Sequence, residues 1–437
     1  MAEKVLFLNQ KPDRPASLEE YRESGGYGAL ALTLEKYSPG QLCDLVTESG
    51  LRGRGGAGYP TGRKWHSFAR RKEGPRYVVP NTDEMEPGTF KDRVLVNLDP
   101  HLIIEGIILA AYAIQADRGI FFIRPSYEQD AQLIEGELRR AREEGYLGRK
   151  ILGSDFSFDI TVHRSAGRYI CGEASAQVRA IQGLRPNPHK VPGVHLADRG
   201  LWDRPTLVNN AETLACIPGI ISRGPQWFKG LARTPTGAGN KLFCVSGRVV
   251  RPGCYELPMG TPLNQIIEQE AGGMLPGSEF KACLPGGAST RFLPKRQWEV
   301  PMDFEPLKKI GHLLGTSSII VFDQKTCLVA ATINLLDFFV RESCGWCTPC
   351  RDGLPFMRHL LLEIEHGRGR EEYIPMLRSM ASQMRHAYCA FAPGAAEPVL
   401  GLLEYFEDEI REHISQKRCP CVLADDGTGF RSKLCPI

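Results

Sequence analysis

The sequence predicts an α/β domain with a parallel sheet, followed by a small α+β unit and a helical region. Three observations support this order. Short apolar strands alternate with helices through the first half, the pattern changes near Gly239, and from Thr326 onward only helical periodicity remains. A chain of 437 residues can bury two or three hydrophobic cores, since domains usually have about 100–200 residues.

The first half contains three predicted strands, each followed by a helix. The strands are Arg76–Val79, Gly119–Ile123 and Phe158–His163. The first helix begins at His101. The second has Ser126 as its N-cap and ends before Gly145, and the third runs from Ala174 to Ile181. Strands that alternate with helices of this length predict a doubly wound, Rossmann-like parallel sheet.

The predicted α+β unit begins with a hairpin formed by Lys241–Ser246 and Gly253–Leu257. We expect a short helix capped by Thr261, with Pro262 at its first position. Two further strands, near residues 281–285 and 317–322, complete the unit. In the helical region, apolar residues three and four positions apart predict one buried face, formed by Val399, Leu403, Phe406, Ile410 and Ile414.

The composition is that of an ordinary globular protein. Apolar residues make up 42% and charged residues 24%, and a net charge of +3 gives no electrostatic reason to expect nucleic-acid binding. The first nine residues lack the apolar run of a secretory leader. The most apolar segment, residues 102–114, is too short to span a bilayer and contains Glu105, so we expect no direct membrane insertion. These features predict a cytoplasmic protein with reduced thiols.

A cysteine triplet near the C-terminus is the strongest chemical signal. Cys344, Cys347 and Cys350 follow a C-x2-C-x2-C spacing that places three thiolates on one turn, and the distant Cys389 can supply a fourth. This arrangement favours a [4Fe–4S] cluster. A zinc site, which usually uses two separated C-x2-C pairs, and a redox pair are the alternatives.

Most other cysteines have no ligand spacing. We expect Cys43, Cys216, Cys244, Cys254, Cys283 and Cys327 to pack as small hydrophobic residues, and Cys171 to hold no metal. Cys419, Cys421 and Cys435 lie in the tail. They could bind metal or form disulfides, but we favour a disordered tail.

A glycine-rich loop, Leu51–Trp65, is the second dense signal. Five glycines between Gly53 and Gly62 let backbone amides approach a phosphate or a flat ring, and neighbouring arginine and lysine side chains add positive charge. It is neither a Walker A loop nor a regular G-x-G-x-x-G motif, and a structural turn is the alternative.

Polar residues follow the predicted strands, where open α/β sheets bind ligands. Residues 81–92 include Asn81, Asp83, Glu84 and Glu86, which could bind ring edges or hydroxyl groups, although a solvated acidic loop is the alternative. Residues 166–174 again connect a strand to a helix. Asn209 and Asn210 could cap a helix or bind phosphate.

Five motifs in this order resemble the flavoprotein (F) subunit of NADH–quinone oxidoreductase, respiratory complex I, and related diaphorase subunits. They are Arg-Gly-Arg-Gly-Gly-Ala-Gly, Asp-Glu-Met-Glu-Pro-Gly, Tyr-Ile-Cys-Gly-Glu, Val-Asn-Asn-Ala-Glu-Thr-Leu and the cysteine triplet. The resemblance implies an FMN- and NADH-binding domain (1–235, with an N-terminal extension) and a ubiquitin-like β-grasp domain (236–323). A four-helix bundle holding the [4Fe–4S] cluster (324–415) and the cysteine-containing tail (416–437) follow.

The resemblance also implies the site residues. Cys344, Cys347, Cys350 and Cys389 would bind the cluster, Tyr59 would stack on the adenine, and Glu84 and Glu86 would position the nicotinamide side. No side chain would act as a catalytic acid or base, because the hydride passes between cofactors. The residues expected around FMN and NAD(H) are Gly53, Arg54, Gly55, Gly56, Ala57, Gly58, Tyr59, Gly62, Lys64, Asn81, Asp83, Glu84, Glu86, Tyr169, Gly172, Glu173, Asn209 and Asn210.

The implied function is hydride transfer from NADH to FMN, then single-electron transfer to the cluster and on to partners, towards quinone. The implied partners are a thioredoxin-like [2Fe–2S] subunit and a larger multi-cluster iron–sulfur subunit, which would hold the chain peripherally at the inner membrane. The sequence departs from the family at Ala174, where a glutamate is usual, and at Lys190–Val194. An electron-relay subunit of another reductase, hydrogenase or formate dehydrogenase, with a weakened or lost NADH site, is therefore the alternative.

Overall fold

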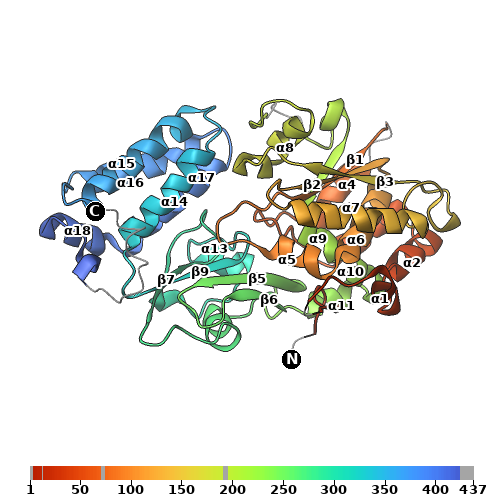
Figure 1. The fold of residues 1–437 in the computed structure, drawn as a ribbon, viewed down its shortest axis with the longest axis horizontal. Coiled ribbons are helices and arrows are strands. Elements are labelled where there is room, and N and C mark those ends of the chain that lie inside the picture. Colours follow the sequence, from red (N-terminus) through yellow and green to blue (C-terminus); the bar gives the residue numbers. More distant parts are fainter. Residues whose placement is uncertain (1–2, 12, 70–73, 190–194, 424–437) are drawn as a thin grey trace.

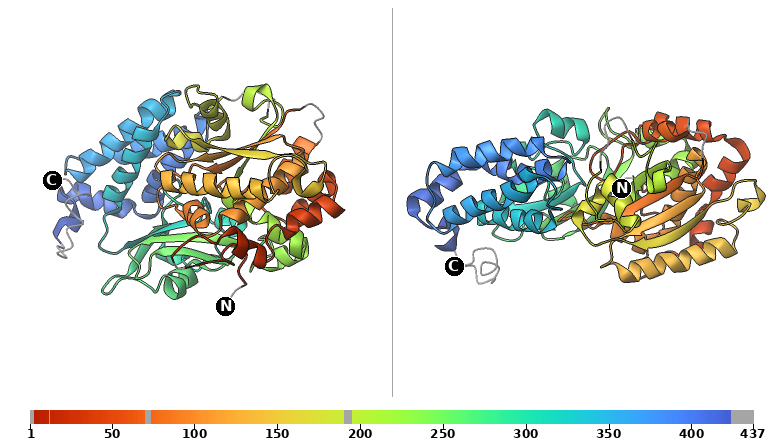
Figure 2. Two further views of the ribbon diagram at one scale, coloured as in Figure 1. Left: turned by 45° about the vertical axis from the view of Figure 1, so that its right-hand side comes forward. Right: turned by 90° about the horizontal axis from the view of Figure 1, so that it is seen from above.

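The computed structural model describes residues 3–11, 13–69, 74–189 and 195–423. The first domain lies at one end of the molecule and the C-terminal helices lie at the other, with the sheet of the second domain beside both (Figures 1 and 2). Among the described residues, no single helix is long and apolar enough to span a membrane. One sharply bent pair, α5 (Lys91–Leu98) with α6 (Pro100–Ile114), reaches the length and apolar composition of a span only when the two helices are taken together.

The first domain contains the predicted parallel sheet. Its strands lie in the order β3-β2-β1-β4, and every neighbouring pair is parallel. The strands are β1 (Tyr77–Thr82), β2 (Arg118–Ile123), β3 (Asp159–Arg164) and β4 (Thr206–Asn210). The helices are α1 (Leu18–Glu23), α2 (Gly28–Lys36), α3 (Pro39–Glu48), α4 (Thr61–Ala69), α5 (Lys91–Leu98), α6 (Pro100–Ile114), α7 (Glu128–Glu143), α8 (Ala174–Ile181), α9 (Ala211–Ala215), α10 (Ile217–Arg223) and α11 (Pro225–Gly230).

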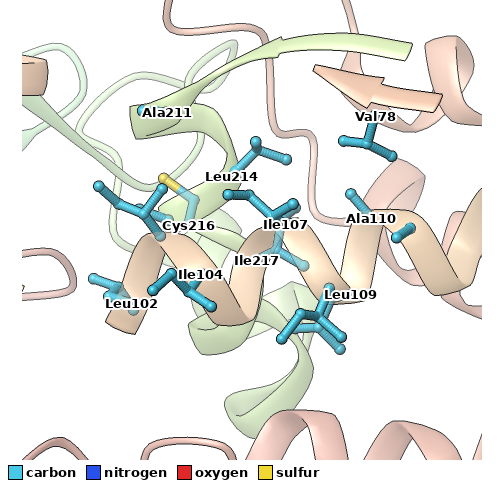
Figure 3. Packing of buried hydrophobic residues seen from close by; sticks show 14 of the residues in the cluster. Val78, Leu102, Ile104, Ile107, Leu109, Ala110, Ala211, Leu214, Cys216 and Ile217 are labelled. Atoms are coloured by element: carbon cyan, nitrogen blue, oxygen red, sulfur yellow. The ribbon is translucent and has the colours of Figure 1, made fainter. Parts of the chain in front are cut away.

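Both faces of this sheet are buried, as the apolar strands predict. Val78 and Phe121 belong to the large core on one face, whereas Val79 and Phe122 belong to a smaller core on the other. Helix α6 is buried along almost its whole length and packs against β1, α9 and α10 (Figure 3). The segment 102–114 is therefore a core helix, as expected.

The second domain is a five-stranded mixed sheet in the order β6-β5-β9-β7-β8. The antiparallel hairpin of β5 and β6 confirms the prediction. Its elements are β5 (Asn240–Gly247), β6 (Gly253–Pro258), α12 (Leu263–Gln265) with a π-helical continuation (Ile266–Glu270), β7 (Phe280–Leu284), β8 (Leu293–Pro294), α13 (Phe304–Lys309) and β9 (Ser318–Asp323).

The helices of the last region enclose one apolar core that also contacts residues of both other domains. Helix α14 packs against α15 and α17, and α16 packs against α17. The helices are α14 (Leu328–Glu342), α15 (Leu354–Glu365), α16 (Tyr373–Gln383), α17 (Phe391–Tyr405) and α18 (Glu407–Gln416). A π-helix (Pro349–Gly353) precedes α15, and a 3₁₀ turn (Pro420–Leu423) follows α18.

Three local predictions were wrong. Ser126 is not the N-cap of α7, because Tyr127 occupies that position without a side-chain cap. Thr261 does not cap α12, because its hydroxyl donates to the Pro258 carbonyl and Pro262 takes the cap position. The apolar positions from Val399 to Ile414 do not share one helix, since the chain breaks between α17 and α18 at Phe406, whose φ is −137°.

Candidate active site

A cavity of about 730 Å³ opens at the carboxyl ends of the parallel strands. Ligands in open α/β sheets bind at this edge, and the volume is in the usual range for small-molecule sites. The glycine-rich loop, the second domain and the start of α17 provide the other walls. Twelve predicted residues line it: Gly55, Gly56, Ala57, Asn81, Asp83, Glu84, Glu86, Tyr169, Gly172, Glu173, Asn210 and Cys389.

Asp83, just after β1, carries a carboxylate oxygen that lacks a protein partner. Its Oδ1 accepts a hydrogen bond from the Ser165 hydroxyl at 3.0 Å, whereas its buried Oδ2 has no partner among the described residues. Burial raises the pKa of Asp83 to about 6, against the lowering effect of Ser165. A buried polar atom normally has a hydrogen-bond partner, so this oxygen is suited to a ligand donor.

Glu84 and Glu86 line the cavity, but both carboxylates also bind neighbouring protein groups. Glu84 accepts the backbone N–H groups of Asp92 (2.9 Å) and Arg93 (3.2 Å), and thereby caps the start of α5. Burial, reinforced by the Asp92 charge, raises the pKa of Glu84 to about 7.

Glu86 connects the strand edge to the second domain. Its Oε1 accepts from the Ser289 backbone N–H at 2.7 Å and from the Ser289 hydroxyl at 2.8 Å, and its Oε2 accepts from the Tyr169 hydroxyl at 2.5 Å. Burial raises the pKa of Glu86. These bonds fix Tyr169 against the cavity wall.

Lys91 is a cavity residue that was not predicted. Its fully buried ammonium group contacts Asp92 at 2.7 Å, Glu212 at 3.1 Å and the Asn210 side-chain oxygen at 3.0 Å. Burial alone would lower the pKa of Lys91, but Asp92 and Glu212 outweigh it and hold the pKa above its ordinary value. In the sequence, the signal that could have identified Lys91 is its position within the polar segment that follows β1.

The glycine-rich loop is anchored to the second domain through Arg52. The Arg52 guanidinium donates to the Gly58 carbonyl (2.7 Å) and to Glu305 (3.0 Å), and it lies 4.1 Å from the centre of the Phe304 ring. Phe304 and Glu305 line the cavity with Arg52. The loop and α13 therefore form one wall.

Seven other residues predicted around FMN and NAD(H) lie outside the cavity lining, as do the predicted cluster ligands Cys344, Cys347 and Cys350. Arg54 donates to the Ala238 carbonyl at 2.6 Å, Lys64 donates to the Val208 carbonyl, and Asn209 accepts from the Trp65 ring at 3.1 Å. Burial lowers the pKa of Lys64 to about 8. Tyr59 is half exposed. The full set is Gly53, Arg54, Gly58, Tyr59, Gly62, Lys64 and Asn209.

Gly172 and Glu173 lie at the entry to α8. A Cβ at Gly172 would meet no atom within 4 Å, so the position leaves open space at the cavity wall. Glu173 caps α8 by accepting the Ala176 backbone N–H at 2.9 Å, and Ala174 is the first residue of the helix. The altered segment Lys190–Val194 lies outside the described residues.

The four predicted cluster cysteines come together beside this cavity. Burial, reinforced by the neighbouring Cys347, Cys344 and Cys389 groups, raises the pKa of Cys350 to about 12. The Ser343 hydroxyl lies 3.1 Å from the Cys350 sulfur. Cys389 also lines the cavity.

The cavity fits a flavin nucleotide and the cysteines fit a four-iron cluster. The unpaired Asp83 oxygen can accept from a flavin or ribityl donor, and Gly172 leaves room for a flat ring. Four thiols, of which three come from one turn, match the ligand set of a [4Fe–4S] cluster. The geometry thus defines a class, the flavin- and iron–sulfur-binding oxidoreductase subunits.

Family models match all three regions in the same order. The Nuo51 FMN-binding domain matches residues 46–219, the SLBB domain matches 242–293, and the NADH-ubiquinone oxidoreductase-F iron-sulfur binding region matches 330–413. The chain belongs to the family of flavoprotein (F) subunits of NADH-quinone oxidoreductase.

Two relatives are similar to this chain over nearly their whole length. The chain is 43% identical to an NADH-quinone oxidoreductase flavoprotein (F) subunit of Rhizobium meliloti (strain 1021), over 96% of this chain and 100% of that protein. It is 42% identical to the corresponding protein of Escherichia coli (strain K12), over 92% and 91%. A solved NAD⁺-reducing [NiFe]-hydrogenase in the air-oxidized state matches with a TM-score of 0.80 and 32% identity, over 94% of this chain and 68% of that chain.

Proposed function

We propose that this chain is an NADH dehydrogenase flavoprotein subunit that binds FMN and NADH in the cavity and a [4Fe–4S] cluster at the adjoining cysteines. The observation that carries the proposal is the shared wall, since Cys389 lines the same cavity as Asp83 and Gly172. When bound, FMN accepts a hydride from NADH and releases single electrons, which the cluster accepts. The chain's own residues then need only to bind and orient FMN and NADH and to exclude water from the cavity.

The proposed flavin side is the strand edge. The backbone of Gly55, Gly56 and Ala57 gives close access to a flat ring or phosphate, because these residues have little or no side chain. Asp83 accepts a ligand hydrogen bond, and the buried Lys91 places a positive charge close to the Asn210 amide. Gly53, Lys64, Gly172, Glu173 and Asn209 complete the proposed set, in part by holding the loop and helix ends.

The proposed dinucleotide side faces the second domain. Tyr59 is half exposed and is available to stack on adenine. Arg52 and Phe304 fix the glycine-rich loop beside it, and Glu86 positions the nicotinamide side through Tyr169. Arg54, Gly58 and Gly62 shape the loop, since a Cβ at Gly62 would overlap the Thr47 backbone. No side chain needs to act as acid or base in this scheme.

The proposed domain organisation follows the predicted boundaries: 1–235, a β-grasp domain at 236–323, a four-helix bundle at 324–415 and the tail at 416–437. The extensive packing among α14, α15, α16 and α17 supports the bundle. Electrons that leave the cluster require protein acceptors. The partners that we propose are a thioredoxin-like [2Fe–2S] subunit and a larger multi-cluster subunit, which would hold this cytoplasmic chain peripherally at the membrane.

An anaerobic NADH titration of the FMN- and cluster-loaded chain tests this function, followed by the flavin absorbance. We expect the flavin to be fully bleached at about 1.5 equivalents of NADH, because each NADH supplies two electrons, whereas the flavin accepts two and the cluster accepts one. Flavin that resists millimolar NADH but bleaches with dithionite would contradict NADH oxidation and would favour an electron-relay subunit.

A further inference from the structure

A second group of cysteines meets at the opposite end of α14 from the cluster residues. Cys327 precedes the first residue of α14, and Cys419 and Cys421 follow α18. The sequence favoured a disordered tail, but residues 420–423 form a 3₁₀ turn and Cys419 is only 4% exposed, whereas Cys435 lies outside the described residues. Cys327 interacts with the side chains of both tail cysteines.

His413 of α18 joins these thiols. The His413 Nε2 atom lies 3.4 Å from the Cys327 sulfur and 3.2 Å from a carboxylate oxygen of Glu365. The ligand atoms of Cys327, Glu365, His413 and Cys419 all lie within 4.8 Å of one another, and all four residues are buried. Cys421 approaches Cys327 in a second grouping that includes Glu409.

The hydrogen bond on the other imidazole nitrogen orients His413 as a ligand. The Nδ1 atom lies 2.7 Å from the Glu409 carbonyl, which can only accept, so Nδ1 carries a proton. In the neutral imidazole, Nε2 then presents its lone pair to the thiol and carboxylate group. Metal-binding histidines usually have this arrangement, in which the nitrogen that does not bind the metal donates to an oxygen.

The two neighbouring carboxylates, Glu409 and Glu365, have different protein partners. Glu409 accepts the Leu328 backbone N–H at 2.7 Å with one oxygen and pairs with Lys281 at 2.8 Å with the other. Glu365 contacts both His413 and the Cys327 sulfur, at 3.2 and 3.6 Å. This group of side chains thus combines three thiols, one oriented imidazole and negative charge, and its ligand atoms lie close enough together to hold a metal ion.

We propose that Cys327, His413, Cys419 and Cys421 form a structural zinc site. Three thiolates and one imidazole are a ligand set typical of tetrahedral structural zinc, and soft thiolate ligands favour zinc over magnesium or calcium. In this arrangement Glu365 does not bind the zinc ion and contacts the His413 ligand instead. A Zn²⁺ ion would supply the positive charge that closely packed thiolates and Glu365 require.

The position of the site indicates a structural role. Helix α14 has 15 residues, so its ends lie about 22 Å apart at 1.5 Å per residue, with Cys327 at one end and Cys344 just beyond the other. The zinc site joins the start of α14 to α18 and the following turn. It therefore fastens the C-terminal segment and takes no part in the proposed electron route.

The test measures zinc and iron separately by mass spectrometry in the full-length chain, purified anaerobically with reductant. We expect about one zinc per chain. The variants Cys419→Ser and Cys421→Ser should each lower zinc to near zero while iron and NADH-driven flavin bleaching stay unchanged. Cys283→Ala, which removes a buried thiol outside the site, and Glu365→Gln should both retain zinc.

Four results would overturn the proposal. They are wild-type chain without zinc, zinc that persists in both serine variants, extra iron in place of zinc, and a disulfide that joins Cys327 to Cys419 in the reduced preparation. Loss of zinc in Glu365→Gln with retention in Cys421→Ser would contradict the assignment of the fourth ligand.

A cobalt substitution gives a readout that does not depend on the stability of the variants. Co²⁺ loaded into the zinc-depleted wild-type chain should show the visible bands and sulfur charge transfer of a tetrahedral thiolate site. Octahedral cobalt bands without sulfur charge transfer would contradict the proposed ligands.

Discussion

The two groups of cysteines in the C-terminal region differ in how their ligands are brought together. Three of the proposed cluster ligands lie within seven residues, Cys344–Cys350, so their spacing alone indicates a metal site. The proposed zinc ligands span residues 327–421 and meet only because α14 and α18 pack together. Local spacing is thus readable from the sequence, whereas a site assembled by helix packing is not.

The two groups also differ in their surroundings. Cys389 lines the cavity at the carboxyl edge of the sheet, and Cys344 and Cys347 are half-buried. Cys327, His413 and Cys419 are buried at the far end of α14, next to Glu365. The first group adjoins a ligand cavity, as electron transfer needs. The second group connects chain segments, as a structural site needs.

The largest effect should come from removing a cluster ligand. Cys350→Ser should lower iron from about four atoms per chain to near zero, because a serine hydroxyl is a poor ligand for iron–sulfur clusters. Zinc should remain at the wild-type level. Elemental analysis measures both metals, and loss of zinc together with iron would contradict the independence of the two groups.

Asp83→Asn should have the next largest effect, on flavin affinity. Loss of the carboxylate weakens a charge-assisted hydrogen bond to FMN, which is worth about 1.5–3 kcal/mol, or about 10- to 100-fold in Kd. Fluorescence titration of the FMN-free protein measures this affinity. Unchanged affinity would exclude Asp83 from the flavin site.

The same variant should have the opposite effect on the stability of the FMN-free protein. Because burial raises the pKa of Asp83 from 3.8 to about 6, the cost of ionising this carboxylate in the folded state builds up between about pH 4 and pH 6 and is complete above pH 6. Asp83→Asn should therefore raise the free energy of unfolding at pH 8 by about 1–3 kcal/mol, and the gain should shrink as the pH falls towards 4. A gain that grows on acidification would contradict this sign.

Arg52→Ala should have a smaller effect, confined to the dinucleotide side. It removes the link between the glycine-rich loop and α13, including the contact with Phe304, which is worth about 0.5–2 kcal/mol. We expect the KM for NADH to rise about 3- to 10-fold with little change in kcat. Steady-state reduction of an artificial acceptor measures both constants, and loss of FMN would show a wider role for Arg52.

Cys171→Ala should have the smallest effect. Cys171 is fully buried among the apolar side chains of the smaller core of the first domain and belongs to neither group of cysteines, so we expect its thiol to bind neither metal. Iron, zinc and the NADH titration should all match the wild type. A lower content of either metal would place Cys171 in one of the two groups.

The sequence predicted much of the fold because its signals are local. The alternating strands and helices indicated the parallel sheet, and the polar residues after β1 and β4 meet because these strands pair with Asn81 opposite Asn210. Helix caps and the break at Phe406 were missed, since tertiary packing decides them.

The candidate site was predicted less completely. Asp83 and Gly172 follow strand ends, so their approach to one cavity could be expected. The contact of Lys91 with Glu212 could not, because it joins positions 121 residues apart across the fold. Cys327 has no ligand spacing in the sequence, and only the packing of α14 against α18 brings it to His413.

The most direct test of the proposed function is electron paramagnetic resonance of the loaded chain, frozen after anaerobic addition of NADH. We expect the signal of a reduced [4Fe–4S] cluster in the wild type. In Cys350→Ser the flavin should bleach without that signal. Bleached flavin in the wild type with a cluster that only dithionite reduces would contradict electron transfer from the cavity to the adjoining cysteines.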